Sequence, residues 1–389
     1  MIPERVKELG QELYPKLDKL TKDLYDNPEL ADEEYFASNS HCDLLREYGF
    51  TVEENFCGKA TGFRAVYDTN KPGLNAAFLA EYDALPGIGH GCGHNILGAV
   101  SSGAGIILKH LIGETGGKVT VLGTPAEESN GAKPHYIENG VFDGIDLVLM
   151  AHPADAWYLS GSSQALIPLQ FEFFGKSAHA ASAPEMGQNA LDAGVITYTA
   201  VNALKGHIAR TSSVAGVILE GGKAPNIVPD YCLMRYYVRS ADRTYNVKLA
   251  ERIKDCAKAG ASATGTYLEI TKFEPEFINL LTNETLSGVY KATALEEFGL
   301  DISAKRSFGS GDIGNVSHVC PTINPYFDIS GGEPCPGHST EKAFQSVTDY
   351  AYEQAHKAAL LLALTAFKCM SGPALYKAVR DEFEKSRII

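Results

Sequence analysis

Basic side chains are in short supply in this chain. It carries 34 Lys and Arg residues against 48 Asp and Glu residues, a formal net charge of -14. Nucleic acids and anionic membrane surfaces are bound by basic patches, so this balance argues against both as partners. It does not exclude an anionic small molecule as a substrate, because a bound metal ion can invert the local electrostatic field.

Long apolar runs are missing as well. No segment approaches the roughly 20 apolar residues of a membrane span, and the charged opening Met-Ile-Pro-Glu-Arg-Val-Lys lacks the apolar core of a signal peptide. Internal repeats and low-complexity tracts are also absent. The 8 cysteines are widely spaced over 389 residues, which favours reduced thiols over a disulfide framework. We therefore expect a soluble, cytoplasmic protein.

The apolar pattern predicts two kinds of domain. Strands that alternate with helices indicate an α/β domain with a mixed, largely parallel sheet and helices on both faces. Over 166–277 the pattern changes to long alternating strands and two helices, which indicates a smaller α+β domain with an antiparallel sheet. The sequence thus predicts one domain formed by 1–165 and 278–389, interrupted by an inserted domain. Near the C-terminal end, a single long helix is expected over 341–367.

Polar side chains follow three of the predicted strands directly. The strands at 75–80, 118–123 and 147–151 run into Glu81-Tyr82-Asp83, Pro-Ala-Glu127-Glu128 and His152. In open α/β sheets, sites lie just outside the carboxyl ends of the strands. We therefore expect these carboxylates and this imidazole to converge at one edge of the sheet.

The stretch Pro-Gly-Ile-Gly-His-Gly-Cys-Gly-His-Asn, residues 86–95, places Cys92 and His94 one residue apart. In an extended segment such side chains share a face, and glycines let the backbone fold tightly around whatever they hold. A thiolate with an imidazole suits zinc or a similar divalent ion. The alternative is a glycine-rich loop with a buried thiol and a hydrogen-bonded imidazole. A phosphate loop is disfavoured because no Lys-Ser/Thr follows.

Each remaining candidate also has a purely structural interpretation. Adjacent carboxylates such as Glu127 and Glu128 are usually solvated, but one can ligate a metal while the other acts as general base. His152 at a strand end can have a purely structural role. His338 in a Gly/Pro-rich loop can be a surface residue without a function. Asp83 is either a helix cap or a partner that fixes a histidine tautomer. His179 lies in the inserted domain, so a role for it requires that domain or a second protomer to reach the site.

Eight motifs occur together in an order that resembles a known family. They are NPEL, EYDALPGIGHGCGHN, GTPAEE, MAHP, GKSAHAASAPEMGQNALDA, GGKAPNIVPD, GSGDIGNVS and PGHS. Over nearly its whole length the chain resembles the amidohydrolase branch of the aminoacylase/carboxypeptidase-type dinuclear metallopeptidases. Within that branch the likeness is greatest to the p-aminobenzoyl-glutamate hydrolase subunits and to aminoacylase-1-like dipeptidases.

The resemblance implies a metal-dependent hydrolase of N-acyl amino acids, dipeptides or p-aminobenzoyl-glutamate-type conjugates. It implies two divalent metals, with zinc favoured over manganese, cobalt or nickel because a thiolate is soft. The implied metal ligands are Cys92 (bridging), His94, Glu128, His152 and His338. The implied catalytic residues are Glu127 as general base for a metal-activated water, Asp83 behind the ligands, and His179. The implied substrate contacts are Asn226 and, more weakly, Arg239.

The resemblance also implies that the inserted domain acts as a lid and as the interface of a homodimer. Two departures from many relatives, Gly-His-Asn-Ile-Leu at 93–97 and Pro184-Glu185, point towards the dipeptidase-like subgroup. Two other functions stay open at this point. The chain could be a non-catalytic or partner-dependent subunit of such a hydrolase, or a hydrolase in which Cys92 is the nucleophile.

Overall fold

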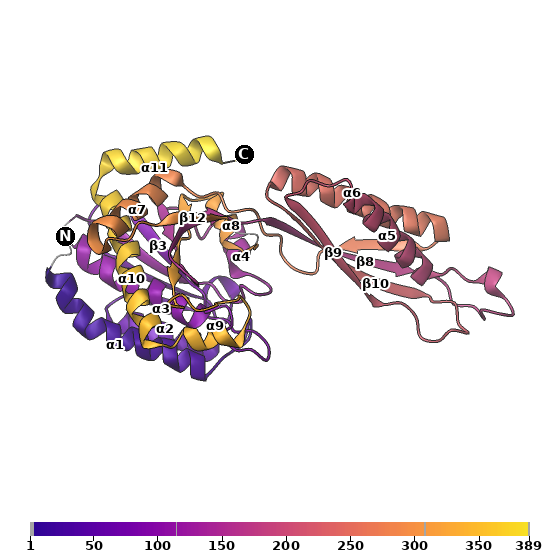
Figure 1. Cartoon of the computed structure of the whole chain (residues 1–389), viewed down its shortest axis with the longest axis horizontal. Helices are drawn as coiled ribbons and strands as arrows, with labels where there is room; N and C mark the ends of the chain where they lie inside the picture. The colour runs from indigo at the N-terminus through magenta and orange to yellow at the C-terminus, as the bar shows by residue number, and fades with distance from the viewer. Residues whose placement is uncertain (1–3, 114, 307–308, 388–389) are drawn as a thin grey trace. The chain divides into compact units, whose positions relative to one another are not determined.

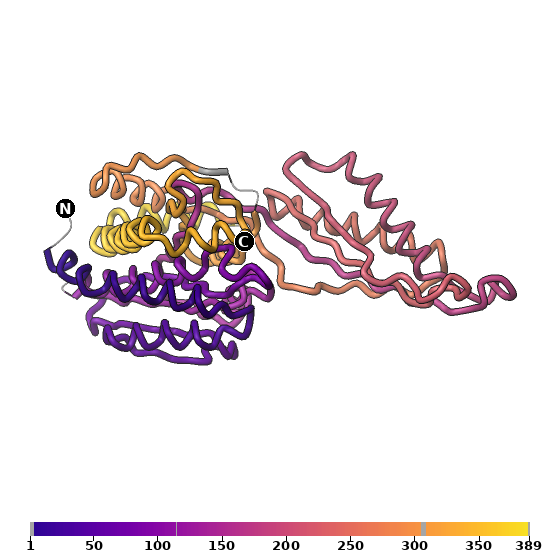
Figure 2. The backbone as a smooth tube through the Cα atoms, turned by 60° about the horizontal axis from the view of Figure 1, so that its bottom comes forward, coloured from indigo at the N-terminus to yellow at the C-terminus, as the bar shows by residue number. Residues whose placement is uncertain are grey.

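The computed structural model describes residues 4–113, 115–306 and 309–387. Contacts between Cα atoms divide the chain into a larger unit of Met1–Ser162, Leu280–Ser307 and Asp312–Ile389, and an inserted unit of Ser163–Asn279 with Phe308–Gly311. The predicted boundaries at 165/166 and 277/278 lie within three residues of these. The first and last described residues, Glu4 and Arg387, both lie in the larger unit (Figures 1 and 2).

The larger unit is built on a mixed, largely parallel sheet of six strands. β3, β4, β5 and β13 run parallel, and a β1–β2 hairpin adds the antiparallel edge. The strands, in spatial order, are β1 (Thr51–Glu54), β2 (Phe63–Asp68), β4 (Lys118–Gly123), β3 (Asn75–Ala80), β5 (Leu147–Leu149) and β13 (Thr322–Ile323). A small second sheet contains β12 (Ser303–Arg306), β7 (Tyr158–Ser162), β14 (Tyr326–Asp328) and β6 (His152–Ala154).

Helices cover both faces of the main sheet, as predicted. Alternate residues of β3 enter different cores: Ala76, Phe78 and Ala80 pack with α1, α3 and α10, whereas Ala77 and Leu79 pack with α4 and α8. This alternation is the period of two expected of a strand buried on both faces. The helices are α1 (Glu4–Asp26), α2 (Tyr35–Glu47), α3 (His94–Ile112), α4 (Ala132–Glu138), α7 (Glu284–Phe298), α8 (Ile313–Ser317), α9 (Thr340–Gln345), α10 (Asp349–Ser371) and α11 (Pro373–Ser386).

Two details of the predicted elements were wrong. The single helix expected over 341–367 is two helices, because α9 ends at Gln345 and α10 begins at Asp349, with the Thr348 hydroxyl accepting the Ala351 N–H as a new N-cap. The strand expected to run on to Ala151 stops at Leu149, and His152 opens β6 in the second sheet. Apolar composition alone does not show either break.

The expectation that no segment approaches a membrane span was wrong: helix α3 is long and apolar enough to cross a membrane by length and composition, and the bent pair α10 and α11 passes the same test together. However, 89% of the apolar window of α3 is buried inside the protein. Its glycines allow this close packing: a Cβ at Gly105 would lie 2.4 Å from Val121 Cγ2 of β4. In this structure α3 is the central core helix of the larger unit.

The inserted unit is an antiparallel sheet with two helices on one face, the α+β arrangement that its pattern predicts. Its spatial strand order is β11 (Tyr267–Thr271), β8 (Ala165–Phe174), β10 (Tyr231–Ser240) and β9 (Ser212–Glu220). The helices are α5 (Ala190–Lys205) and α6 (Arg243–Thr264). Inward residues such as Phe171, Met234 and Ile253 form one core with both helices.

Candidate metal centre

The segment that carries Cys92 and His94 is a tight turn followed by a helix. The extended conformation expected for it was wrong: Gly93 has a φ of +87° and His94 is the first residue of α3. A Cβ at Gly93 would also lie 2.6 Å from Pro153 Cγ. Glycine is therefore required twice, for the left-handed backbone and for the close approach to the strand that begins with His152.

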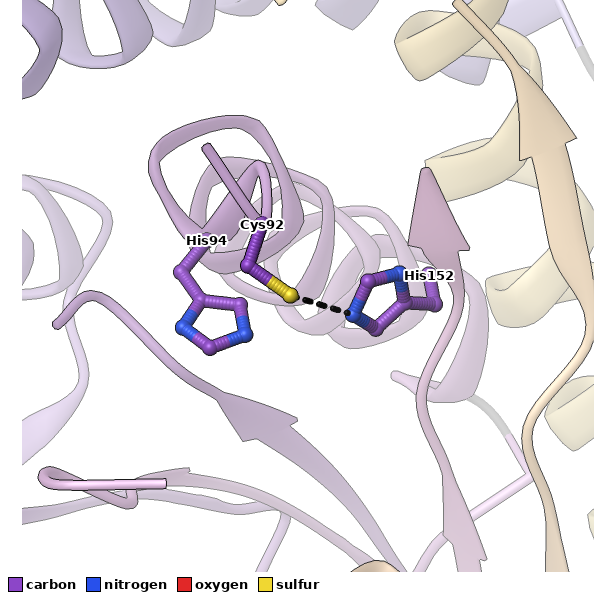
Figure 3. A group of neighbouring side chains, drawn as sticks. All are labelled: Cys92, His94 and His152. Carbon is purple, nitrogen blue, oxygen red and sulfur yellow. Dashed lines mark hydrogen bonds between the residues drawn. The ribbon is translucent and has the colours of Figure 1, made fainter. Parts of the chain in front are cut away.

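Cys92 lies between two histidines that come from different elements (Figure 3). Its Sγ is 3.6 Å from Nε2 of His152. The other ring nitrogen of His152, Nδ1, donates to the Pro153 carbonyl at 3.0 Å, so Nε2 is the nitrogen with a free lone pair. Burial lowers the pKa of His152 well below its usual value, which keeps the ring in the neutral form that binds metals.

Asp83 holds two of the predicted ligands at once. It is fully buried after β3, and its Oδ1 accepts a hydrogen bond from His94 Nδ1 at 2.8 Å. Its Oδ2 accepts the backbone N–H of Glu128 at 2.9 Å. A carboxylate on Nδ1 fixes the histidine tautomer and leaves Nε2 for a metal. Of the two interpretations that the sequence allowed for Asp83, this contact is the one with a histidine; its place behind metal ligands stays a prediction.

His338 reaches the centre from a distant loop. Its backbone N–H donates to the Gly91 carbonyl at 3.1 Å, which ties the loop to the Cys92 turn. Its Nε2 lies 3.3 Å from Oε1 of Glu128, with 58% of the His338 side chain exposed. The carboxylate that follows β4 and the imidazole of the C-terminal segment thus meet at the edge that the strand ends define.

Six side chains form a continuous set of potential metal ligands. In each of three overlapping triples the ligand atoms lie within 4.8 Å of one another: Cys92, His94 and His152; Cys92, Glu128 and His338; His94, Glu127 and Glu128. Cys92 belongs to a triple with two histidines and to a triple with Glu128. That position is the one a ligand shared between two ions would occupy.

Two unpaired atoms indicate that cations fit this cage. His94 Nε2 and Glu128 Oε1 are buried without a hydrogen-bond partner in the described part of the chain. Glu81 Oε2 lies 3.3 Å from His94 Nε2. Two acceptors that face each other at this distance require a proton or a cation between them. Nitrogen, sulfur and oxygen donors at such spacing suit zinc and similar divalent ions.

A buried charge cluster beside the cage was missed by the sequence reasoning. The Lys133 ammonium is fully buried; it donates to Glu81 Oε1 at 2.6 Å and to a carboxylate oxygen of Asp312. The one available signal was Glu81, two residues before Asp83 at a strand end. Nothing in the local sequence of Lys133 or Asp312 shows that they would be paired across 179 positions.

The electrostatics of the centre depend on its crowded carboxylates. Burial, together with Glu81, Asp312 and Glu128, raises the pKa of Glu127 well above its usual value. Burial also raises the pKa of the Cys92 thiol to about 11. Both raised pKa values show that this environment disfavours the ionised forms of the two side chains. A bound cation would stabilise these forms and lower both pKa values.

Three predicted residues belong to the inserted unit. His179 is exposed, and its Nδ1 accepts the N–H groups of Ala181 and Ser182, both at 3.2 Å. Asn226 is brought next to it, because its carbonyl accepts the Ala180 N–H at 3.0 Å. Arg239 lies on β10 and lines a cavity of about 460 Å³ together with Arg210 and the hydroxyl residues 211–213. Arg210 was not predicted from the sequence.

Known proteins agree with this architecture. The inserted unit matches a peptidase dimerisation domain of the M20 type over residues 163–264. Xaa-Arg dipeptidase of Mus musculus is 35% identical over 406 residues, covering 99% of this chain and 92% of that protein. The chain belongs to the M20 peptidase family. As a member it is a metal-dependent hydrolase, as the sequence predicted.

Further relatives are consistent with the family assignment. A p-aminobenzoyl-glutamate hydrolase subunit of Escherichia coli K12 is 33% identical over 71% of this chain and 61% of its own length. Two solved structures share the fold. An aminobenzoyl-glutamate utilization protein from Klebsiella pneumoniae has a TM-score of 0.73 at 20% identity, over 91% of this chain and 98% of that one. A dinuclear metal-binding M20 peptidase from Bacillus subtilis has a TM-score of 0.66 at 19% identity, over 90% and 99%.

The buried cluster gives a prediction about stability. Lys133→Met leaves Glu81 and Asp312 buried without their cation, so we expect the free energy of unfolding of the metal-free protein to fall by about 3–5 kcal/mol. The matched control is Lys118→Met, because Lys118 pairs with Asp68 at 2.8 Å while 51% and 36% of the two side chains are exposed. That change costs about 0–1 kcal/mol. Equilibrium unfolding in urea measures both, and equal losses would contradict the assignment.

Proposed function

We propose that this chain hydrolyses the amide bond of dipeptides, N-acyl amino acids or p-aminobenzoyl-glutamate-type conjugates at two divalent cations. The observation that carries the proposal is the set of overlapping ligand triples with a glutamate, Glu127, among them. The relatives, a dipeptidase and a p-aminobenzoyl-glutamate hydrolase subunit, support the substrate class. Both kinds of substrate present an amide bond next to a free carboxylate.

The proposed ligands are those predicted from the sequence: Cys92, His94, Glu128, His152 and His338. Zinc is the preferred ion because the set contains a thiolate and three imidazoles, with manganese, cobalt or nickel as alternatives. When bound, such ions polarise a carbonyl and lower the pKa of water. Asp83 keeps His94 in the metal-binding tautomer and holds the Glu128 backbone at the same time.

Glu127 is the proposed general base. It lies in a ligand triple with His94 and Glu128, and its side chain is partly exposed, so a water molecule can reach it. The adjacent residue, Glu128, lies 3.3 Å from His338 Nε2 and also belongs to the triple with Cys92 and His338, so we assign it the role of ligand. Glu127 takes the proton from the attacking water and returns it to the leaving amine.

The inserted unit supplies the proposed substrate contacts. His179 accepts two backbone N–H groups at Nδ1, so its proton lies on Nε2. An exposed Nε2–H can donate to the oxyanion of a tetrahedral intermediate, a contact worth roughly 10²–10³ in rate. Asn226 lies beside it. Arg239 pairs with Leu166 at the other end of the sheet from the segments of His179 and Asn226, which adjoin the Phe174–Tyr231 end. We therefore propose the cavity that Arg239 and Arg210 line for a substrate carboxylate, at a different site from the one that His179 serves, since guanidinium groups bind carboxylates in two-pronged geometry.

A cysteine-nucleophile mechanism fits the site less well. Such enzymes lower the pKa of the thiol with a neighbouring base or a helix N-terminus. Here burial raises the pKa of Cys92 to about 11, although His94 acts to lower it, and the other neighbouring imidazole, His152, is held neutral by burial, which lowers its pKa. Cys92 is therefore better suited to ligate a cation than to attack a carbonyl.

Two substitutions on adjacent residues separate the proposed roles. We expect Glu127→Gln to retain the metals of the wild type while kcat falls by about 10²–10⁴-fold, because the base is lost. Its matched partner, Glu128→Gln, weakens metal binding, and its activity recovers in part when zinc is added in excess. Metal analysis and hydrolysis of a panel of dipeptides and N-acyl amino acids, with and without a chelator, measure both. Near-normal kcat in Glu127→Gln would refute the assignment, whereas a metal-loaded wild type without activity would favour a partner-dependent subunit.

We also propose that the chain forms a homodimer through the inserted unit. The match to a peptidase dimerisation domain supports this. β9 is an edge strand, and its Val217 and Leu219 are 50% and 52% exposed. Unpaired edges of this kind readily pair with another strand. On α5, Val195 and Ile196 add exposed apolar surface.

The dimer has its own test. We expect the double variant Val217→Lys/Leu219→Lys to sediment as a monomer, because two charges on the edge oppose strand pairing. Val247→Lys is the control, since Val247 is 40% exposed on α6. Analytical ultracentrifugation at several concentrations distinguishes the two. A double variant that stays dimeric would place the interface elsewhere.

We further propose a cytoplasmic location. The 4 buried cysteines, Cys42, Cys232, Cys320 and Cys369, form no disulfide. Reduced thiols of this kind support a reducing compartment.

A further inference from the structure

The turn that carries Glu127 and Glu128 contains a strained residue. Ala126, directly before the pair, has a φ of +63°. For a residue with a Cβ the left-handed conformation costs roughly 1–2 kcal/mol. Such a conformation persists only where neighbouring groups enforce it. The structure should therefore contain a group that holds Ala126 in place.

That group is the side chain of Glu34. Its Oε1 accepts the Ala126 backbone N–H at 2.8 Å, and its Oε2 accepts the Thr61 hydroxyl at 2.8 Å. Glu34 is fully buried. It occupies the N-cap position of α2, yet its carboxylate makes no capping bond to that helix. Burying a carboxylate costs free energy unless hydrogen bonds compensate for it. The Glu34 carboxylate does not bond to its own helix, so its hydrogen bond to the turn needs another explanation.

The turn is held from both sides. Ala126 N–H is bound by Glu34, and two residues later the Glu128 N–H is bound by Asp83 Oδ2 at 2.9 Å. Glu127 lies between these two anchors. Because each anchor fixes one peptide plane, together they set the directions in which the side chains of Glu127 and Glu128 leave the backbone.

We propose that Glu34 is a positioning residue that holds Ala126 in the left-handed conformation and so aims Glu127 and Glu128. This inference rests on the proposed function, in which Glu127 is the base and Glu128 a metal ligand. Glu34 itself touches neither substrate nor metal ligand atoms; it acts through the Ala126 peptide.

The test combines loss of the acceptor with relief of the strain. Glu34→Met keeps the side-chain volume without an acceptor, and we expect kcat to fall about 10²-fold, the effect of a misplacement near 1 Å, with a smaller change in KM. Glu34→Gln retains an oxygen for Ala126 and donates to Thr61, so it stays close to wild type. Ala126→Gly adopts a positive φ without strain, so Glu34→Met/Ala126→Gly regains at least about tenfold of the lost kcat.

The matched control is Glu29→Met. The Glu29 carboxylate accepts the N–H groups of Phe36 and Ala37, each at 2.9 Å, at the start of the same helix. It affects the stability of this segment without touching Ala126. We expect its kcat to stay within about threefold of wild type. A folded Glu34→Met that Ala126→Gly does not rescue, or a folded Glu34→Gln that loses kcat to the same extent, would overturn the proposal.

A second readout needs no substrate. Because Glu128 moves when the turn relaxes, Glu34→Met should bind zinc at least about tenfold more weakly in competition with a chromophoric chelator, and Ala126→Gly should restore the affinity. If wild type binds zinc with this pattern but hydrolyses nothing, the positioning role stands and the proposed function fails. If wild type is active but zinc affinity is unchanged in Glu34→Met, the positioning role fails alone.

Discussion

The candidate metal centre depends on one constraint: it gathers more carboxylates than the basic groups of the chain pair with. Five carboxylates lie near the carboxyl ends of β3 and β4: Glu81, Asp83, Glu127, Glu128 and Asp312. Lys133 pairs with two of them, and Asp83 is satisfied by His94 and a backbone N–H. Isolated buried charge is too costly to persist. The imbalance left around Glu127 and Glu128, next to a thiol and three imidazoles, is the physical reason to place cations there.

Two residues with unusual backbone conformations, Gly93 and Ala126, place the candidate ligands. Gly93 brings the Cys92 turn against the strand of His152, and Ala126 turns the chain after β4 directly before Glu127 and Glu128. Both residues have positive φ, but they reach it differently. Glycine adopts it freely, whereas alanine needs the Glu34 carboxylate. The ligand cage therefore depends on local turns as much as on the sheet beneath them.

The sequence predicted which candidate ligands would lie together better than the shape of the segments that carry them. β3 and β4 occupy the predicted ranges, because their apolar runs end sharply at Glu81 and Thr124. By contrast, Cys92 and His94 were expected on an extended segment and lie on a turn and a helix start. The pairing of Lys133 with Asp312 and of Glu34 with Ala126 spans 179 and 92 positions. Long-range partners of buried polar groups leave no local pattern, so residues of this kind were missed.

We propose above all that two cations share the Cys92 sulfur. The most direct measurement is a crystal structure of zinc-loaded protein with anomalous data collected on both sides of the zinc absorption edge. The account predicts two zinc peaks per chain, both bonded to Cys92 Sγ, one with His94 or His152 and the other with Glu128 or His338. A single peak, or two peaks without a bond to Cys92, would contradict it.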